Sequence, residues 1–356
     1  MSKTIKNSFF KVLTFEKLYL AHMRAKRNKT NKYEVILFEK NLENNLVILL
    51  NKLKEGKYKT GMYRSFKIYE PKVREIQSLP YVDRVVHQWY IEEFIKPYIM
   101  KRFIFNTYAC LENRGTHKAV YNVKYNLINY KRKFGDCYIL KCDIKKFFKS
   151  INKDILFCIL SDYITDKKLL EFTKIIIYSD DNLTSIPIGN YSSQFFANIY
   201  LDKLDKYVKN TLKCKYYTRY MDDFILILKD KNEAKIFKEK IEIFLKLNLN
   251  LELNHKSRYY PLSFGVDFCG YRIFTTHTLL RVNSKYKINR KVNKWNKEWS
   301  NNLLNFSSAI SSLNSWFGHI KHCNSFNIEN KIIKKCDFLY SKYTIENIEN
   351  QLNNLK

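Results

Sequence analysis

Two adjacent aspartates, Asp222 and Asp223, stand between two runs of residues that favour β-strands. The run Lys-Tyr-Tyr-Thr-Arg at 215–219 comes before them, and the apolar run Phe-Ile-Leu-Ile-Leu at 224–228 comes after them. This pattern is typical of a hairpin with a tight acidic turn. Such a hairpin would hold both carboxylates at its tip, because the apolar strands on either side fix them in place.

Asp143 supplies a third carboxylate, because it ends another strand-like run at residues 137–142. Carboxylates crowded into one site repel each other by about 4 kcal/mol per pair at ~4 Å and an effective dielectric of ~20. Without a counter-charge, one of them would take up a proton or move away. Two Mg²⁺ ions would remove this repulsion and would clamp the attacking and leaving oxygens of an in-line displacement. The three carboxylates therefore predict two-metal phosphoryl transfer.

An ordinary turn is the alternative interpretation of the two adjacent aspartates, since Asp is common in turns. The chain contains a second Tyr-x-Asp-Asp pattern at 178–181, which serves as an internal comparison. The apolar run 175–177 comes before it, but polar residues follow and no second strand begins, so we predict a loop there. The catalytic interpretation of the first pattern depends on Asp143 and on a motif between the two acidic sites.

That motif, Ile-Pro-Ile-Gly-Asn-Tyr-Ser-Ser-Gln-Phe-Phe-Ala-Asn, occupies residues 186–198. Together with Asp-Ile-Lys-Lys-Phe-Phe at 143–148 and Tyr-Met-Asp-Asp at 220–223, it resembles the ordered palm motifs of reverse transcriptases. Within that superfamily the chain is most similar to the reverse transcriptases of diversity-generating retroelements. These carry an Ile-Gly-Asn-x-x-Ser-Gln element where many relatives have Gly-x-x-x-Ser-Pro. Here Gln194 occupies the Pro position.

Further matching blocks extend the resemblance over about residues 60 to 325. They lie at 69–74, 83–87, 108–110, 114–117, 265–271 and 316–322. Several blocks in the same order are much stronger evidence than any single motif. One departure is Cys269, where relatives commonly have Leu, and this small apolar exchange puts nothing catalytic in doubt.

The resemblance implies an α+β fold, a right-hand polymerase with fingers, an antiparallel-sheet palm and a helical thumb. We expect a basic helical N-terminal extension at 1–60, fingers at 61–135, a palm at 136–278 with a finger-side insertion at about 151–185, and a helical thumb at 279–356. Local patterns add helices at about 152–160, 168–178 and 231–247, a strand at 63–69, and a strand pair around 249–253 and 268–274.

The resemblance also implies roles for the residues around the acidic sites. Asp143, Asp222 and Asp223 would hold the metals, and the main-chain carbonyl of Ile144 would join them. Phe148 stands where similar polymerases place an aromatic side chain that clashes with a ribose 2′-OH, which would make the product DNA. The alternative for Phe148 is a place in the core.

Five residues complete the predicted contacts with the incoming nucleotide. Lys72 and Arg74 would hold the triphosphate, although among 64 basic residues a solvated surface is the alternative. Gly189 permits a close approach of the backbone or a positive φ, and Gln194 would begin the helix beneath the nascent base pair. Lys256 is a candidate for protonating the pyrophosphate leaving group, or for a simple phosphate contact.

The chain has 356 residues and a formal net charge of +30. A strongly basic chain attracts phosphate backbones in a salt-sensitive and sequence-independent way. The chain is also rich in Lys, Asn, Ile and Tyr, as an AT-rich coding sequence would produce, so part of the charge is open to explanation as compositional drift. We therefore predict nucleic-acid binding without assigning it to one surface.

Composition also argues against several classes of protein. A hydrophobic content of 46% excludes a wholly disordered chain. No apolar run approaches the roughly 20 residues of a membrane span, and the first residues lack the apolar core of a signal peptide. The eight cysteines are scattered without a Cys-x-x-Cys pair, which argues against a zinc knuckle or a disulfide framework. We expect a protein of a reducing cytoplasm without a membrane partner.

The function that the resemblance implies is RNA-directed DNA synthesis that makes error-prone, adenine-mutagenised cDNA from a template-repeat RNA, for diversity-generating retrohoming. The implied partners are the template RNA, the cDNA/RNA duplex, dNTPs and a small basic accessory protein, the accessory variability determinant, which forms a pentamer. Two Mg²⁺ ions would be the cofactors, and Mn²⁺ can substitute. The alternative is an antiphage defence or abortive-infection reverse transcriptase, which shares the three aspartates. A group II intron maturase is not expected, because the chain ends soon after the predicted thumb.

Overall fold

The computed structural model describes residues 4–6, 8–69, 73–180 and 182–340, and the chain forms two compact units. The first unit comprises residues 1–115 and 140–259, and the second comprises residues 116–139 and 260–356. Among the helices that the structure describes, none combines the length and the apolar character needed to cross a lipid bilayer.

Most of the first unit is helical. Its N-terminal part contains α1 (Phe9–Val12), α2 (Phe15–Ala25), α3 (Tyr33–Glu39), α4 (Leu42–Lys54), α5 (Tyr81–Tyr90), the π-helical segment η1 (Ile91–Ile95), α6 (Lys96–Tyr98) and the 3-10 segment η2 (Met100–Arg102). The helix α2 packs on α4 and α5. Leu46, Leu49 and Leu53 of α4 lie at helical spacing and are buried in the core of this part.

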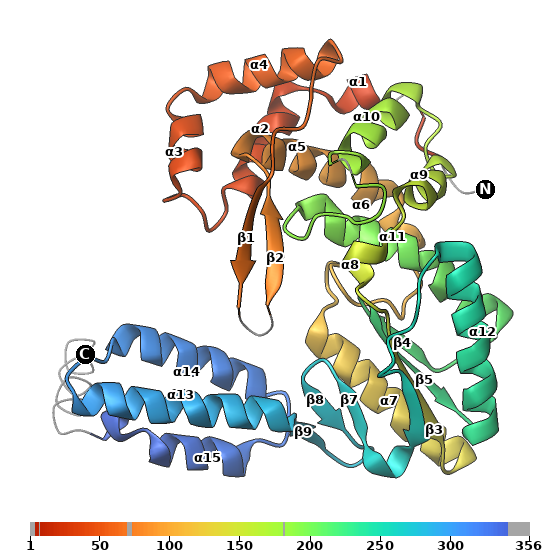
Figure 1. Cartoon of the computed structure of the whole chain (residues 1–356), viewed down its shortest axis with the longest axis vertical. Helices are drawn as coiled ribbons and strands as arrows, with labels where there is room; N and C mark the ends of the chain where they lie inside the picture. The colour runs from red at the N-terminus through yellow and green to blue at the C-terminus, as the bar shows by residue number, and fades with distance from the viewer. Residues whose placement is uncertain (1–3, 7, 70–72, 181, 341–356) are drawn as a thin grey trace. The chain divides into compact units, whose positions relative to one another are not determined.

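The strands β1 (Arg64–Ile68) and β2 (Arg74–Ser78) form an antiparallel hairpin that extends from this helical layer (Figure 1). The predicted strand at 63–69 is therefore present. The Gln77 amide donates a hydrogen bond of 2.9 Å to the carbonyl of Ile188. This bond fastens β2 to the loop that leads into the next long helix of the unit.

The remaining helices of the first unit are α8 (Phe147–Ser150), α9 (Lys153–Ser161), α10 (Lys167–Ile177), α11 (Tyr191–Lys206), the π-helical segment η3 (Tyr207–Thr211) and α12 (Lys231–Leu249). The predicted helices near 152–160, 168–178 and 231–247 correspond to α9, α10 and α12. Each of these three begins at a side chain that accepts a backbone N–H, which is a strong local start signal. The capping residues are Asn152, Asp166 and Asp230.

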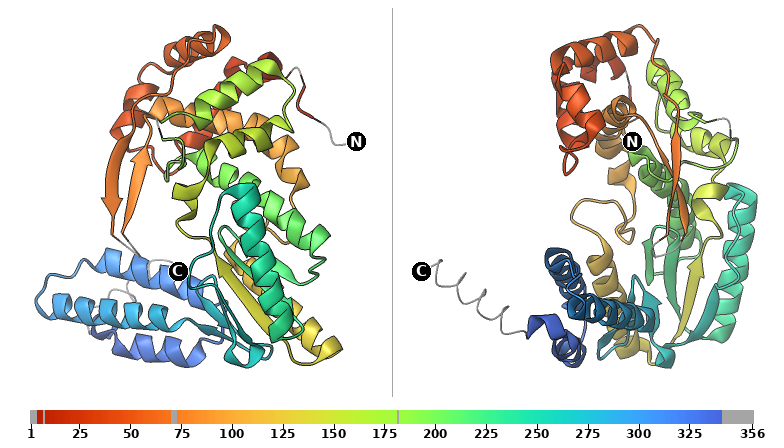
Figure 2. Two further views of the ribbon diagram at one scale, coloured as in Figure 1. Left: turned by 45° about the vertical axis from the view of Figure 1, so that its right-hand side comes forward. Right: turned by 60° about the vertical axis from the view of Figure 1, so that its left-hand side comes forward.

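A four-stranded sheet carries the acidic motifs. Its strands are β3 (Tyr138–Asp143), β4 (Tyr217–Tyr220), β5 (Asp223–Leu228) and β6 (Arg258–Pro261), and their order is β4-β5-β3-β6. The apolar run 224–228 is buried at every position, which means that both faces of β5 are covered. The helix α12 lies against one face of this sheet (Figure 2).

The expected strand pair around 249–253 and 268–274 does not form, because the first range holds no strand and the second holds a turn followed by the short strand Tyr271–Ile273. Asn250 adopts φ 48° as the left-handed cap of α12, and beyond it only Leu253 pairs, in an isolated bridge with Ile144. The segment 268–274 is not one strand, because Cys269 and Gly270 have φ values of 48° and 90° and form a two-residue turn. This turn connects β7 (Val266–Phe268) and β8 (Tyr271–Ile273).

In the second unit, β7, β8 and β9 (Thr278–Leu280) form a three-stranded antiparallel sheet, and α7 (Thr116–Phe134) packs on β8. Three helices follow, namely α13 (Val282–Ser300), α14 (Phe306–Ile320) and α15 (Phe326–Lys335), with the 3-10 segment η5 (Asp337–Leu339) after them. These helices lie side by side around a common core that includes Val292, Leu313 and Phe338 (Figure 1). Trp316 and Phe317 pack against this core.

Histidines from distant parts of the chain meet within the second unit. The His117 ring of α7 stacks on the His322 ring with 3.6 Å between their centroids. The Tyr271 hydroxyl lies 3.0 Å from Nδ1 of His319. Burial lowers the pKa of both His117 and His319, and the neighbouring histidines lower it further. These contacts join α7 to the end of α14 and to the strand β8.

Candidate active site

The acidic motif forms the predicted hairpin. Tyr220 pairs with Asp223, and Met221 and Asp222 are the two residues of the turn between β4 and β5. Met221 has φ 55°, a left-handed conformation that costs an L-residue about 1–2 kcal/mol. Such a conformation persists only where surrounding contacts enforce it. One of those contacts is a 3.0 Å hydrogen bond that the Arg219 guanidinium donates to the Met221 carbonyl.

Asp143 ends β3, which lies beside β5 in the sheet. Its Oδ2 accepts a hydrogen bond of 2.9 Å from the Asn254 side-chain amide, and its carbonyl accepts one of 2.7 Å from the Asn254 backbone. The Ser257 hydroxyl also lies 3.2 Å from that carbonyl. Asn254 and Ser257 were not predicted as site residues. Asn254 stands two residues before the predicted Lys256, and this closeness in the sequence was the signal that could have found it.

The three carboxylates influence one another electrostatically. The pKa of Asp223 is raised to about 6, chiefly by burial; the Lys141 ammonium, 3.1 Å from its Oδ2, opposes this rise, and the charges of Asp143 and Asp222 add to it. Burial and the charge of Asp143 also raise the pKa of Asp222, against the lowering effect of Arg74 and Arg219. The structure therefore brings the three predicted aspartates within electrostatic reach of one another.

The donor set suits a hard divalent cation, which prefers carboxylate oxygens. Oδ1 of Asp223 is buried and has no hydrogen-bond partner within the described part of the chain, so it is available as a ligand. A bound cation would also offset the burial and the repulsion that raise the two pKa values. Among residues 4–6, 8–69, 73–180 and 182–340, however, no group of three His, Cys, Asp or Glu side chains is already arranged to hold a metal ion. Ile144 is buried, and its backbone pairs with Leu253.

Of the two residues predicted to contact the triphosphate, the structure describes Arg74 but not Lys72. Arg74 is exposed at the start of β2 and acts on the pKa of Asp222, so it lies within electrostatic reach of the acidic turn. Lys72 lies outside the described residues. Lys256 is exposed, and it belongs to the turn whose Asn254 contacts Asp143. No described contact brings the Lys256 side chain to the three carboxylates.

Phe148 and its neighbour Phe147 have different surroundings, although they are adjacent on the short helix α8. Phe147 is 2% exposed and belongs to the core, whereas Phe148 is only partly buried. Lys146 precedes them in a left-handed conformation at φ 47°, which turns the chain away from β3 just after Asp143. Of the two aromatic side chains, Phe148 is thus the one available to a ligand near Asp143.

Gly189 has a positive φ and also lies close to a neighbouring backbone, the two conditions that the sequence suggested for this position. Its φ is 132°, and a Cβ at this position would lie 2.6 Å from the carbonyl oxygen of Gln77 in β2. Any other residue would therefore push β2 away from the loop. Gln194 is exposed on the first turn of α11, where its Oε1 accepts a hydrogen bond of 3.2 Å from the Cys110 thiol.

Two residues of the matching block at 83–87 are buried and hydrogen-bonded within the first unit. The Asp83 carboxylate accepts a hydrogen bond of 2.6 Å from the Tyr58 hydroxyl. The His87 ring nitrogen Nδ1 lies 2.8 Å from the hydroxyl of Ser192, in the same motif as Gly189 and Gln194. His87 thus connects α5 to the start of α11.

Acidification should weaken this connection. Burial lowers the pKa of His87 from 6.5 to about 4, so the unfolded chain binds the proton more tightly. The contribution of neutral His87 to the free energy of unfolding is complete above about pH 6.5 and lost by about pH 4, roughly 3 kcal/mol in all. Urea unfolding at neutral pH and at about pH 5 should show a smaller pH-dependent loss in His87→Gln than in the wild type. Equal losses in the two proteins would exclude His87 as the source.

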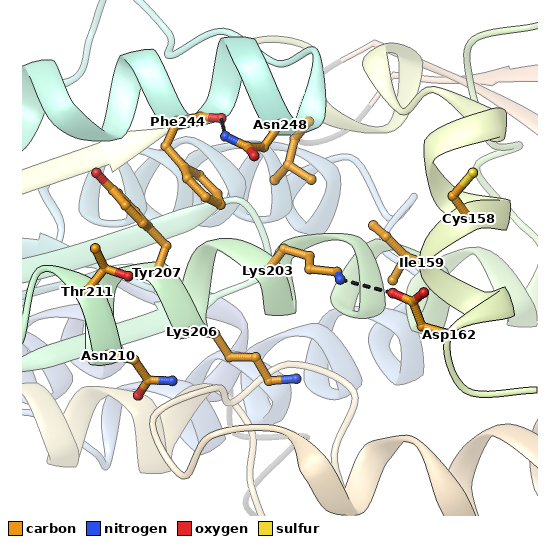
Figure 3. A pocket seen from close by; sticks show the side chains of 11 residues that line it. Cys158, Ile159, Asp162, Lys203, Lys206, Tyr207, Asn210, Thr211, Phe244 and Asn248 are labelled. Atoms are coloured by element: carbon orange, nitrogen blue, oxygen red, sulfur yellow. Dashed lines mark hydrogen bonds and ion pairs between the residues drawn. The ribbon is translucent and has the colours of Figure 1, made fainter. Parts of the chain in front are cut away.

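A cavity of about 480 Å³ elsewhere in the first unit contains none of the three aspartates. It is lined by residues of α9, α11, η3 and α12 (Figure 3). Lys203 there pairs with Asp162 at 3.2 Å, and the Tyr207 and Phe244 rings stack at 4.1 Å. This cavity is separate from the acidic turn, and the site residues predicted from the sequence do not line it.

Comparisons with known proteins agree with this geometry. The sequence model of the family described as reverse transcriptase (RNA-dependent DNA polymerase) matches residues 59–273 of this chain. The COX1/OXI3 intron 2 protein of Saccharomyces cerevisiae is 26% identical over 39% of this chain and 24% of its own length. The chain thus spans about a quarter of the length of this curated relative.

Solved telomerase structures are also similar in part. Apo telomerase from Candida tropicalis, truncated from its C-terminal domain, has 14% identity and a TM-score of 0.46, covering 65% of this chain and 58% of that chain. Telomerase from Candida albicans, in complex with a TWJ fragment of telomeric RNA, has 11% identity and a TM-score of 0.46, covering 67% and 51%.

The family match covers more than half of the chain, including all three aspartates, Phe148, Gly189 and Gln194. Together with the mixed helices and antiparallel sheets, it confirms the predicted fold class, an α+β right-hand polymerase. The chain belongs to the reverse transcriptase family, and the prediction of an RNA-directed DNA polymerase is confirmed at the level of this domain.

Proposed function

We propose that this chain is the reverse transcriptase of a diversity-generating retroelement, which copies a template-repeat RNA into adenine-mutagenised cDNA. The observation that carries the proposal is the position of the Ile-Gly-Asn-x-x-Ser-Gln element. Its Gly189 contacts β2, whose Arg74 reaches the acidic turn electrostatically, and its Gln194 is exposed on α11. An amide at the Gln194 position can form hydrogen bonds that the Pro of many relatives cannot. We infer that it loosens selection opposite template adenines.

The chemistry would take place at Asp143, Asp222 and Asp223. Reverse transcriptase domains generally use divalent metal ions, and two Mg²⁺ ions bound here would supply charge stabilisation at the attacking and leaving oxygens. Asp223, whose pKa lies near 6, is mostly ionised at neutral pH, and a bound cation would favour its charged form further. Lys141 holds Asp223 in the absence of that charge.

The remaining predicted residues would bind and select the nucleotide. Arg74 and Lys72 would contact the triphosphate, and Phe148 would exclude a ribose 2′-OH. Lys256 would contact the leaving pyrophosphate or protonate it. The formal charge of +30 supports binding of template RNA and of the cDNA/RNA duplex. A small basic accessory protein of pentameric form would complete the complex.

Sequencing of cDNA made on the RNA of its own locus tests the proposal. The reaction would contain the purified protein and any small basic protein that a neighbouring gene encodes. An enzyme with both Asp222→Ala and Asp223→Ala would be the blank. We expect errors concentrated at template adenines, and we expect Gln194→Ala to reduce this bias. Lys203→Ala, which removes an ion pair at the far end of the same helix, should leave the error spectrum unchanged.

The other outcomes are equally informative. Faithful or untemplated DNA that depends on the two aspartates would overturn the diversifying function and favour the defence class. An unchanged error spectrum in Gln194→Ala would remove the role of the glutamine while keeping the polymerase.

A further inference from the structure

A fully buried ion pair lies beneath the acidic turn. The side chains of Arg219 on β4 and Asp205 on α11 are both 0% exposed. Nη2 of Arg219 lies 2.6 Å from Oδ2 of Asp205, and its Nε lies 2.7 Å from Oδ1. This two-pronged geometry is the arrangement that makes a buried Arg–carboxylate pair tolerable, because each charge is hydrogen-bonded by the other.

The Asp205 carboxylate also accepts two neutral hydrogen bonds. The Thr107 hydroxyl donates to Oδ2 at 2.7 Å, and the Tyr217 hydroxyl donates to Oδ1 at 2.7 Å. Four donors therefore surround one carboxylate. They come from β4 and from the loop at 106–109, whose backbone bonds to Arg219 on both sides. The pair therefore links β4, α11 and the loop at 106–109 within the first unit.

The remaining nitrogen of Arg219 is directed at the turn itself. Nη1 donates to the carbonyl of Met221 at 3.0 Å and to Oδ1 of Asn198 at 3.0 Å. Asn198 belongs to α11, and its amide donates to the Ala109 carbonyl at 2.8 Å. One guanidinium thus links the left-handed turn residue to the helix that carries Gln194.

We propose that Arg219 is a positioning residue for catalysis, which holds the Met221 carbonyl and so fixes the direction of the Asp222 and Asp223 carboxylates for metal binding. This inference rests on the proposed catalytic role of those two aspartates. A lysine cannot replace the guanidinium, because one ammonium cannot both pair with Asp205 in two-pronged geometry and reach Met221. A displacement of the turn by about 1 Å is enough to lower a reaction rate about 10²-fold.

The test compares Arg219→Lys with Thr107→Val in primer extension by the full chain. Thr107→Val is the matched control, since it removes an equally buried hydrogen bond to Asp205 without touching the turn. Asn198→Ala is a second variant that keeps the ion pair, and it tests the positioning role of Arg219 if Arg219→Lys does not fold. The measurements are kcat, KM for dNTP, the Mg²⁺ concentration at half-maximal rate, and Tm, with rates taken well below each Tm.

For Arg219→Lys we expect kcat to fall about 10- to 100-fold, the Mg²⁺ midpoint to rise, and KM to change little. Asn198→Ala should change kcat and the Mg²⁺ midpoint in the same direction but by less. Thr107→Val should have a lower Tm and an unchanged kcat. The inference would be overturned if the loss of activity followed the loss of Tm alone in all three variants. It would also be overturned if Arg219→Lys and Asn198→Ala both kept the wild-type kcat and Mg²⁺ midpoint. An active Asp222→Ala, Asp223→Ala enzyme would instead overturn the proposed site.

Discussion

Replacing Asp222 or Asp223 with asparagine should lower the rate of DNA synthesis about 10³-fold or more, with little loss of folding stability. Asparagine keeps the shape of the side chain but removes the charge that a divalent cation needs. Because burial raises the pKa of both groups, their ionised forms are costly in the folded chain, and removing the charge relieves that cost. Primer extension on an RNA template and thermal unfolding without metal measure the two effects.

The chain provides a matched control in its second Tyr-x-Asp-Asp pattern. Asp180 lies in the predicted loop, where its carboxylate pairs with the buried Lys153. Asp180→Asn should therefore lower Tm, because it leaves a buried ammonium without its partner. Its kcat should stay at the wild-type value. A loss of DNA synthesis in Asp180→Asn comparable to that in Asp222→Asn would contradict the assignment of the site.

The second large effect is expected for sugar selection. Phe148→Val should lower the preference for dNTPs over rNTPs by about 10²-fold, because a smaller side chain leaves room for the ribose 2′-OH. The half-buried position of Phe148, just after Asp143, is the structural basis for this expectation. The ratio of kcat/KM values for a matching dNTP and rNTP on the same template measures it.

Phe147→Leu is the control for this experiment. Phe147 is 2% exposed and packs in the core, so the change should cost stability, about 1 kcal/mol, without changing sugar selection. If Phe147→Leu relaxed the preference as much as Phe148→Val, the effect would come from general loosening of α8. The exclusion of the ribose 2′-OH would then not be assigned to Phe148.

The acidic hairpin and the capped helices could be predicted because their signals are local. Residues 215–228 contain two β-prone runs around a short polar turn, and the chain forms that hairpin. The helices α9, α10 and α12 begin at Asn152, Asp166 and Asp230, each recognisable as an N-cap. In all these cases the residues that decide the structure lie within a few positions of one another.

The rest depended on partners that are distant in the sequence or on backbone conformations that the residue type does not show. Nothing near Arg219 indicates that Asp205 and Thr107 would enclose it, and nothing near Asp143 singles out Asn254. The predicted strand at 268–274 is reduced to residues 271–273, because a cysteine, Cys269, adopts a left-handed turn conformation that is usually taken by glycine or asparagine. Sequence patterns identify the side chains that carry out the chemistry more easily than the side chains that position them.

The discontinuity of the second unit has a consequence for how the chain is made. During synthesis, α7 leaves the ribosome before residues 140–259, whereas its partners in β8 and at the end of α14 come after them. Val120, Val123 and Leu127 of α7 are buried in the finished structure, and any cover that β8 and the end of α14 provide is missing until the central stretch has been translated. Nascent chains stalled before residue 260 should accordingly be the aggregation-prone species and the preferred clients of chaperones.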